Sequence, residues 1–91
     1  MNYNSQLKEN KLKVARKDLG LTQTQVAEKL GYDIINRISR WERGVAAPNI
    51  INLFRLAALY KTLPHDLYPG LLEKVIEDLN TVNYDFSSFD K

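Results

Sequence analysis

Apolar residues recur along most of the 91-residue chain at the three-to-four-residue spacing that one face of an α-helix produces. In residues 6–19 this spacing predicts a first helix, which ends at Gly20 because glycine suits a left-handed helix cap. The chain contains no repeat and no low-complexity segment, so the pattern predicts an all-α fold. The apolar face of the first helix comprises Leu7, Leu12, Ala15 and Leu19.

A helix-start signal follows the first helix directly. Thr22 and Gln25 form a T-x-x-Q capping box, in which each side chain accepts a hydrogen bond from the other residue's backbone N–H. The second helix is therefore predicted to begin at Gln23 and to end at Gly31. A short turn then leads to a third helix, which ends at Gly44.

Three more helices and a tail complete the predicted fold. A fourth helix begins after Pro48 with Asn49 as its N-cap, a short fifth helix covers residues 64–68, and a sixth covers residues 69–80. Residues 81–91 alternate apolar and polar positions, which is a weak strand signal and equally typical of a loose arm. We divide the chain into a compact domain, residues 6–68, an additional C-terminal helix, residues 69–80, and an aromatic and acidic tail, residues 81–91.

The third helix sorts its side chains onto two faces. Successive residues of an α-helix are about 100° apart, so Ile34, Ile38 and Trp41 fall on one side. The opposite side carries polar and basic side chains, the types that contact base edges and phosphates in the major groove of DNA. Charged helix faces are more often merely solvated, but the capped helix and short turn directly before this one favour binding. The opposite side comprises Asn36, Ser39, Arg40 and Arg43, with Arg37 near its edge.

Glu42 does not fit this division of the third helix. The helical spacing places its carboxylate on the inward face, one turn after Ile38. An unpaired buried carboxylate is costly, so Glu42 requires a cationic or hydrogen-bonding partner. Arg16, on the first helix, is the partner that we expect.

Charge is distributed unevenly along the chain. Residues 1–43 hold nine Lys and Arg against five Asp and Glu, a balance of +4, whereas residues 44–91 hold four against six. The net charge of +2 hides this asymmetry. The N-terminal half is therefore expected to have an anionic partner.

Composition excludes several classes of function. Without cysteine the chain cannot form disulfides, zinc-thiolate sites or a thiol nucleophile. Its single histidine, His65, lies beside Asp66 at a predicted helix start, where a capping role is the ordinary explanation. The chain has no glycine-rich phosphate loop and no paired acid and base. We therefore expect no catalytic residues, no metal site and no cofactor, and we do not expect an enzyme.

Membrane partners are not expected either. No apolar run reaches the roughly 20 residues that span a bilayer. The first residues are polar where a signal peptide needs an apolar core. We therefore expect a cytoplasmic protein.

Several stretches together resemble a known family. LKVARKDLGLTQTQVAEKLG, ISRWERG, AAPNIINLFRLAALY and PHDLY are similar to the Cro and phage-repressor-like helix-turn-helix family, also called the XRE family of DNA-binding domains. The resemblance covers residues 12–68, and it implies a protein of bacterial or phage type that is associated with the nucleoid. It implies a five-helix, lambda-repressor-like domain that binds double-stranded DNA through its second and third helices, followed here by an additional C-terminal helix and tail.

The resemblance also implies roles for individual residues. Gln23 matches a family glutamine that contacts a DNA phosphate, and Arg16 and Glu42 match a structural ion pair. Arg16 is also expected to touch phosphate, together with Arg43 and Asn49. The resemblance implies base readout at five positions, which are Ile35, Asn36, Arg37, Ser39 and Arg40.

Three departures from the family pattern affect these assignments. The chain has one more residue than the common pattern between Gly31 and Ile38, which leaves the register of the third helix open. The loop VAAPN lacks basic residues that some relatives carry there. Lys61 and Leu63 stand where relatives often have Gly and a capping Ser.

We interpret the chain as a transcriptional regulator, a dimeric repressor that reads an inverted repeat. The alternative is an antitoxin or anti-regulator, in which the C-terminal segment binds a protein partner. A protein-interaction module without DNA binding is a third class. The sixth helix covers the domain core or forms a homodimer interface. The tail serves a partner or self-pairing, or is a loose terminus, and its aromatic and acidic residues are Tyr84, Asp85, Phe86, Phe89 and Asp90.

Overall fold

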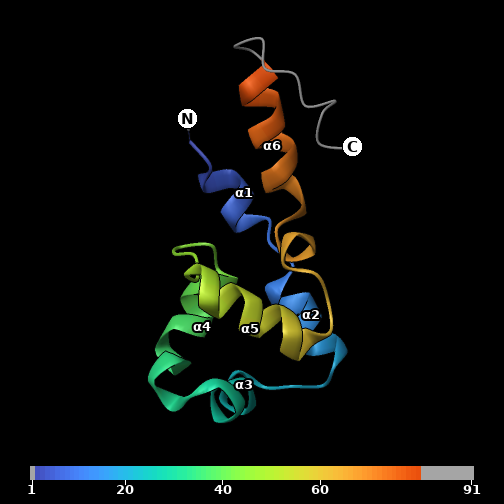
Figure 1. The fold of residues 1–91 in the computed structure, drawn as a ribbon. Helices are drawn as coiled ribbons and strands as arrows, with labels where there is room; N and C mark the ends of the chain where they lie inside the picture. Colours follow the sequence, from blue (N-terminus) through green and yellow to red (C-terminus); the bar gives the residue numbers. More distant parts are fainter. Residues whose placement is uncertain (1, 81–91) are drawn as a thin grey trace.

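A computed structural model describes residues 2–80 and is helical without strands over that range (Figure 1). The predicted all-α fold is therefore confirmed, whereas the predicted tail lies outside the described residues. The elements are α1 (Asn4–Lys8), α2 (Leu12–Asp18), α3 (Gln23–Leu30), the 3₁₀ helix η1 (Tyr32–Ile34), α4 (Ile35–Glu42), α5 (Ile50–Tyr60), the 3₁₀ helix η2 (Pro64–Leu67) and α6 (Pro69–Asn80).

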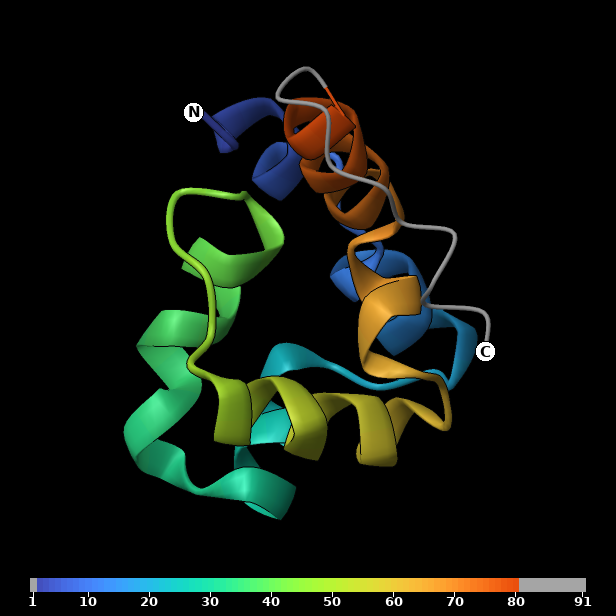
Figure 2. The same cartoon turned by 45° about the horizontal axis from the view of Figure 1, so that its top comes forward.

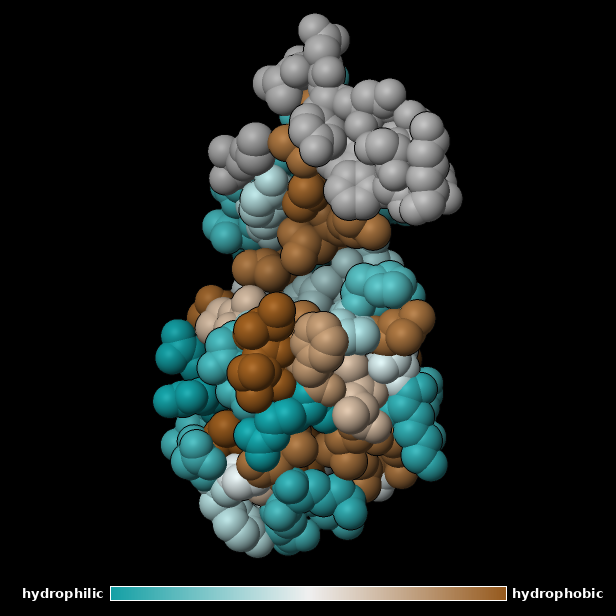
Figure 3. Space-filling model, in the orientation of Figure 1, coloured by the Kyte–Doolittle hydropathy of each residue, from teal (hydrophilic) through white to brown (hydrophobic). Residues whose placement is uncertain are grey.

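The helices form a body and a projection. The helices α2 to α5 and η2 make up the body, and α1 and α6 lie side by side beyond it (Figures 1 and 2). No residue of α6 is fully buried, although Leu71 at its start packs against the core. Leu72, on the next position, is 52% exposed. The part of this region that is visible in Figure 3 is largely apolar.

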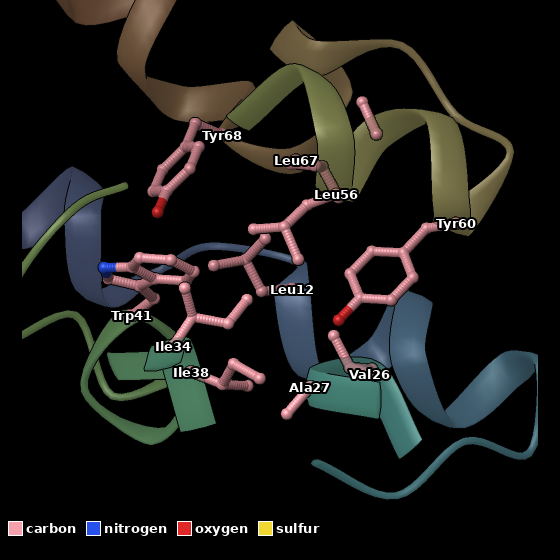
Figure 4. Close-up of a cluster of buried hydrophobic side chains, with 11 residues drawn as sticks. Leu12, Val26, Ala27, Ile34, Ile38, Trp41, Leu56, Tyr60, Leu67 and Tyr68 are labelled. Atoms are coloured by element: carbon pink, nitrogen blue, oxygen red, sulfur yellow. The ribbon is translucent and has the colours of Figure 1, made fainter. Parts of the chain in front are cut away.

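The core lies between the helices of the body. Leu12 of α2 is at its centre, between Ile34 and Ile38 on one side and Leu56 on the other (Figure 4). These side chains are almost fully buried, and burial of each contributes on the order of 2 kcal/mol. The complete cluster comprises Leu12, Val26, Ala27, Ile34, Ile38, Trp41, Leu56, Ala57, Tyr60, Leu67 and Tyr68.

The prediction of a single first helix over residues 6–19 is wrong, because the structure has two helices there, α1 and α2, with a break between them. The break centres on Asn10, whose Oδ1 accepts a hydrogen bond from Leu12 N at 3.0 Å and so caps α2. Its Nδ2 donates to the carbonyl oxygens of Leu7 at 2.6 Å, Trp41 at 3.1 Å and Glu42 at 3.3 Å. Asn10 therefore joins the start of α2 to the end of α4.

The predicted second helix corresponds to α3, and its predicted limits are confirmed. The Thr22 hydroxyl accepts from Gln25 N at 3.0 Å, and Gln25 Oε1 accepts from Thr22 N at 2.8 Å. This reciprocal pair begins α3 at Gln23, because it satisfies two backbone donors that an α-helix leaves free. The helix ends at Leu30, directly before Gly31.

The turn before the third helix is a 3₁₀ helix, and this settles the register that the extra residue left open. Residues Tyr32–Ile34 form η1, so α4 begins at Ile35. At the other end, Gly44 has φ 72°, and a Cβ there would lie 2.7 Å from the Leu7 carbonyl oxygen. Only glycine permits this close approach of α1 to the end of α4.

The fourth helix begins as predicted, and its end is unusual. Asn49 Oδ1 accepts from Asn52 N at 2.8 Å and caps the start of α5. At the other end Lys61 adopts φ 57°, a left-handed conformation that favours glycine. Thr62 N donates to Ala57 O at 3.0 Å, which closes the helix in spite of the strain at Lys61.

Substitution of Asn10 tests its bridging role. Asn10→Ala removes the capping hydrogen bond and the three that Nδ2 donates, so we expect the free energy of unfolding to fall by about 2 kcal/mol in urea denaturation. Asn10→Asp keeps the cap but places a carboxylate against carbonyl oxygens, and should destabilise at least as much. A stable Asn10→Asp variant would show that the donated bonds contribute nothing.

Lys61→Gly should raise the free energy of unfolding by about 0.5–1 kcal/mol. The substitution relieves the left-handed strain, and this gain exceeds the entropy that glycine adds to the unfolded chain. Lys61→Ala is the matched control, because it removes the charge but keeps the Cβ that causes the strain. Thermal denaturation that ranks the Ala variant equal to the Gly variant would contradict the explanation.

Candidate nucleic-acid interface

The helix α4 presents its polar side chains away from the core. Ile38 and Trp41 are buried on the inward side, while Asn36, Arg37 and Arg40 are exposed on the outward side. This arrangement follows from helical spacing, since residues three and four positions apart share a face. Of the other residues predicted for DNA contact on this helix and its end, Arg43 is exposed, Ser39 is half-buried, and Ile35 is half-buried against the core.

Glu42 lies at the junction of α2, α3 and α4. Its Oε2 accepts from Arg16 Nε at 2.6 Å, and its Oε1 accepts from Arg16 Nη2 at 3.0 Å. Gln23 Nε2 donates to the same Oε1 at 3.1 Å. Both charged side chains are almost fully buried, at 9% and 4% exposed, so the ion pair is shielded from solvent.

The pair leaves little of Arg16 for an external ligand. Its Nη1 donates to the Leu21 carbonyl oxygen at 2.8 Å, so Nε and both Nη atoms are engaged within the protein. The hydrogen bond to Glu42 raises the pKa of the Arg16 guanidinium, against the effect of burial, which lowers it. Burial and the Glu42 carboxylate also raise the pKa of nearby Tyr60 to about 12, so the phenol stays neutral.

Gln23 lies at the N-terminus of α3 and is half-buried. One N–H of its amide is held by Glu42, and the other has no protein partner among residues 2–80. The free backbone N–H groups and the positive end of the helix dipole lie at the same place. This combination suits a phosphate oxygen.

A hollow of about 320 Å³ lies between α4 and the start of α5. Arg37 and Arg40 line it from α4, and Asn49, which caps α5, and Asn52 of α5 line the other side. The oxygen of Asn49 is engaged as the helix cap, so only its amide group is left for a ligand. The hollow therefore combines two cationic side chains with a helix N-terminus, an environment that favours anions.

The outward arginines are not neutralised by the protein. Within residues 2–80, neither Arg37, Arg40 nor Arg43 forms an ion pair. The one carboxylate of α4, Glu42, is directed inward to Arg16. The face consequently carries uncompensated positive charge.

Sequence reasoning missed Asn10 and Asn52. Asn52 is only 8% exposed, and its Oδ1 accepts from Arg55 Nη1 at 3.3 Å. Its position one turn before buried Leu56 was a signal that a polar side chain lies inward. No comparable signal marked Asn10, because its acceptors on α4 are more than thirty residues away in the chain.

Two other features bear on possible ligands. No group of three or more His, Asp and Glu side chains that could hold a metal ion occurs among residues 2–80. Over the same range, each helix is too short or too polar to cross a bilayer.

Removal of the Glu42 carboxylate should destabilise the domain strongly. Glu42→Ala leaves Arg16 buried and unpaired, so we expect the free energy of unfolding to fall by about 3–5 kcal/mol in urea denaturation. The double variant Arg16→Met with Glu42→Leu removes both charges and should recover most of this loss. If the double variant is as unstable as Glu42→Ala, the unpaired charge is not the cause.

Comparison with known proteins assigns the body of the fold. A family described as Helix-turn-helix matches residues 12–67, from the first residue of α2 to the last residue of η2. Searches of curated proteins and of solved structures found no match. The family match covers more than half of the chain and includes α3 and α4, the two helices that make up the motif. The chain therefore belongs to the helix-turn-helix family of Cro and phage-repressor-like (XRE) DNA-binding transcription regulators.

Proposed function

We propose that the protein is a transcriptional repressor that binds an inverted-repeat operator as a homodimer, with α4 in the major groove. One observation carries the proposal: α4 exposes Asn36, Arg37 and Arg40, neither arginine forms an ion pair within residues 2–80, and the end of this helix contacts the start of α3. Family membership supports DNA binding, and the unneutralised face supports this surface as the contact. Occupying an operator requires no further catalytic group.

Base readout is assigned to the outward face of α4. Asn36 can pair with adenine, and Arg37 and Arg40 with guanine, each bidentate contact contributing about 1–3 kcal/mol of discrimination. Ser39 and Ile35 have smaller roles, since both are half-buried, and Ile35 offers only its exposed edge to a thymine methyl.

Phosphate contacts are assigned to the two helix N-termini that flank α4. Gln23 offers its second amide N–H at the start of α3, and Asn49 its amide at the start of α5. Arg43, exposed after α4, adds a charge. Arg16 acts mainly by holding Glu42, because its donors are engaged inside the protein.

A two-fold dimer would place two copies of α4 in successive major grooves. Their half-sites then lie about 34–36 Å apart, or a multiple of that distance. Residues 6–68 are the DNA-binding unit in this proposal, and residues 69–80 contribute to dimer formation. Selection from random duplexes should enrich an inverted repeat, and absence of any enriched sequence would contradict the function.

Arg40→Ala and Gln23→Ala should affect DNA binding differently. Arg40→Ala removes a base contact. We therefore expect the affinity for the selected site to fall about tenfold or more, and the base preference to relax at one position of that site. Gln23→Ala removes a phosphate contact, so it should weaken binding to all DNA sequences to a similar degree. Gel shifts on the selected duplex and its single-base variants measure both effects.

Lys61→Ala is the control for charge, because it removes one positive charge at the other end of α5 from α4. It should leave both affinity and preference near those of the wild type. Unchanged preference in Arg40→Ala would remove Arg40 from the readout residues.

A further inference from the structure

The N-terminal half of α5 exposes large apolar side chains that the core does not use. Ile50 is 69% exposed, Ile51 is 67% exposed and Phe54 is 56% exposed. They lie within four residues of one another, on just over one helical turn, and form an apolar ridge. Figure 3 shows this apolar surface on the face of the molecule that carries α5.

An apolar hollow lies beside the ridge. It has a volume of about 350 Å³ and is bounded by α5, η2 and α6. Leu53 lines it from α5, and Leu71, Leu72 and Val75 line it from α6. Leu53, which lines the hollow, is three residues after Ile50 and is its neighbour on the helix surface, so the hollow adjoins the Ile50 side of the ridge.

This face exposes large apolar side chains beside an apolar hollow. Contiguous exposed apolar surface of this kind commonly marks an interaction site. The helix α6 gives the same indication, since none of its 12 residues is fully buried and Leu72 is 52% exposed. DNA is not a suitable occupant, because its backbone requires cationic and hydrogen-bonding groups.

We propose that the α5–α6 face, defined by Ile50, Ile51, Leu53, Phe54, Leu72 and Val75, is the homodimer interface, and that a second copy of this chain is its occupant. The proposal rests on the dimeric function proposed above and names the surface that forms the dimer. A two-fold interface must be self-complementary, because the same patch is used by both copies. A ridge beside a hollow meets this requirement, since the ridge of each copy enters the hollow of the other.

Charge also favours a second copy as the occupant. In a two-fold contact, charges near the axis face identical charges and repel each other. None of the six residues that define the α5–α6 face is charged, and helical spacing places the acidic residues of α6 at least about 100° from Leu72. The one basic side chain among the residues that line the hollow is His65, whose Nε2 lies 3.5 Å from Asp66 Oδ1 of its own copy. Lys74 pairs with Asp78 of its own helix at 3.1 Å, so its charge is compensated within the copy.

The interface leaves DNA contact free. Its residues come from α5 and α6, whereas Asn36, Arg37 and Arg40 lie on α4. Ile50 directly follows Asn49, which lines the cationic hollow, so the dimer contact and the DNA contact meet at the start of α5. Pairing of two copies therefore constrains the spacing of the two α4 helices.

Sedimentation velocity of the full chain over a concentration series tests the interface. Wild type should show a monomer–dimer equilibrium, and Phe54→Glu should weaken it by about 30-fold or more, as truncation of an interface hot spot of about 2 kcal/mol does. Leu72→Glu, on the hollow side, should weaken it as well. Val14→Glu is the matched control, because Val14 is 54% exposed on α2, outside the face. Circular dichroism verifies that each variant is folded.

Gel shifts separate failure of the interface from failure of the proposed function. Folded Phe54→Glu should bind a half-site duplex as the wild type does and lose the additional affinity for the inverted repeat. A wild type that stays monomeric, or that forms a stoichiometric complex with another protein through this face, overturns the interface even if DNA binds. Dimers that persist in both Phe54→Glu and Leu72→Glu also overturn it. A dimer that binds no duplex overturns the proposed function and leaves the interface standing.

Discussion

The orientation of α4 depends on one buried carboxylate. Glu42 accepts hydrogen bonds from Arg16 on α2 and from Gln23 on α3, so three helices meet at a single charged group. A buried charge is tolerated only with its partners in place, which makes other packings of α4 unfavourable. The same contact holds Gln23 at the start of α3. One interaction therefore sets both the helix assigned to base readout and the residue assigned to phosphate.

A second polar contact acts on the same end of α4. Asn10 donates to the carbonyl oxygens of Trp41 and Glu42 in the last turn of the helix, where Trp41 O also accepts from Gly44 N at 3.1 Å. Gly44 allows α1 to approach this end closely. The C-terminal end of α4 is thus held by a side-chain ion pair, a side-chain amide and backbone packing. The exposed residues from Asn36 to Arg40 extend from this fixed end.

The apolar residues of the chain serve two different surfaces. One set forms the core around Leu12, and the other forms the α5–α6 face. The helix α5 belongs to both, since Leu56 and Tyr60 are buried whereas Ile50 and Phe54 are exposed. Its sequence is therefore apolar on most sides, which suits a helix that packs on the core on one side and exposes an apolar surface on another.

Local patterns determined much of the fold. The capping box began α3 at Gln23, helical spacing turned Ile38 and Trp41 inward, and the cost of a lone carboxylate called for a partner to Glu42. These features depend on residues within a few positions, or on a requirement that any fold must meet. The outward residues of α4 could be named for the same reason.

Tertiary structure alone decided the remaining features. The break at Asn10 depends on carbonyl groups of α4, and the hydrogen bond from Gln23 to Glu42 depends on how α3 meets α4. Helical spacing in α5 identifies apolar residues but not which of them are covered. That depends on where the other helices pack, so only the structure distinguishes the core from the α5–α6 face.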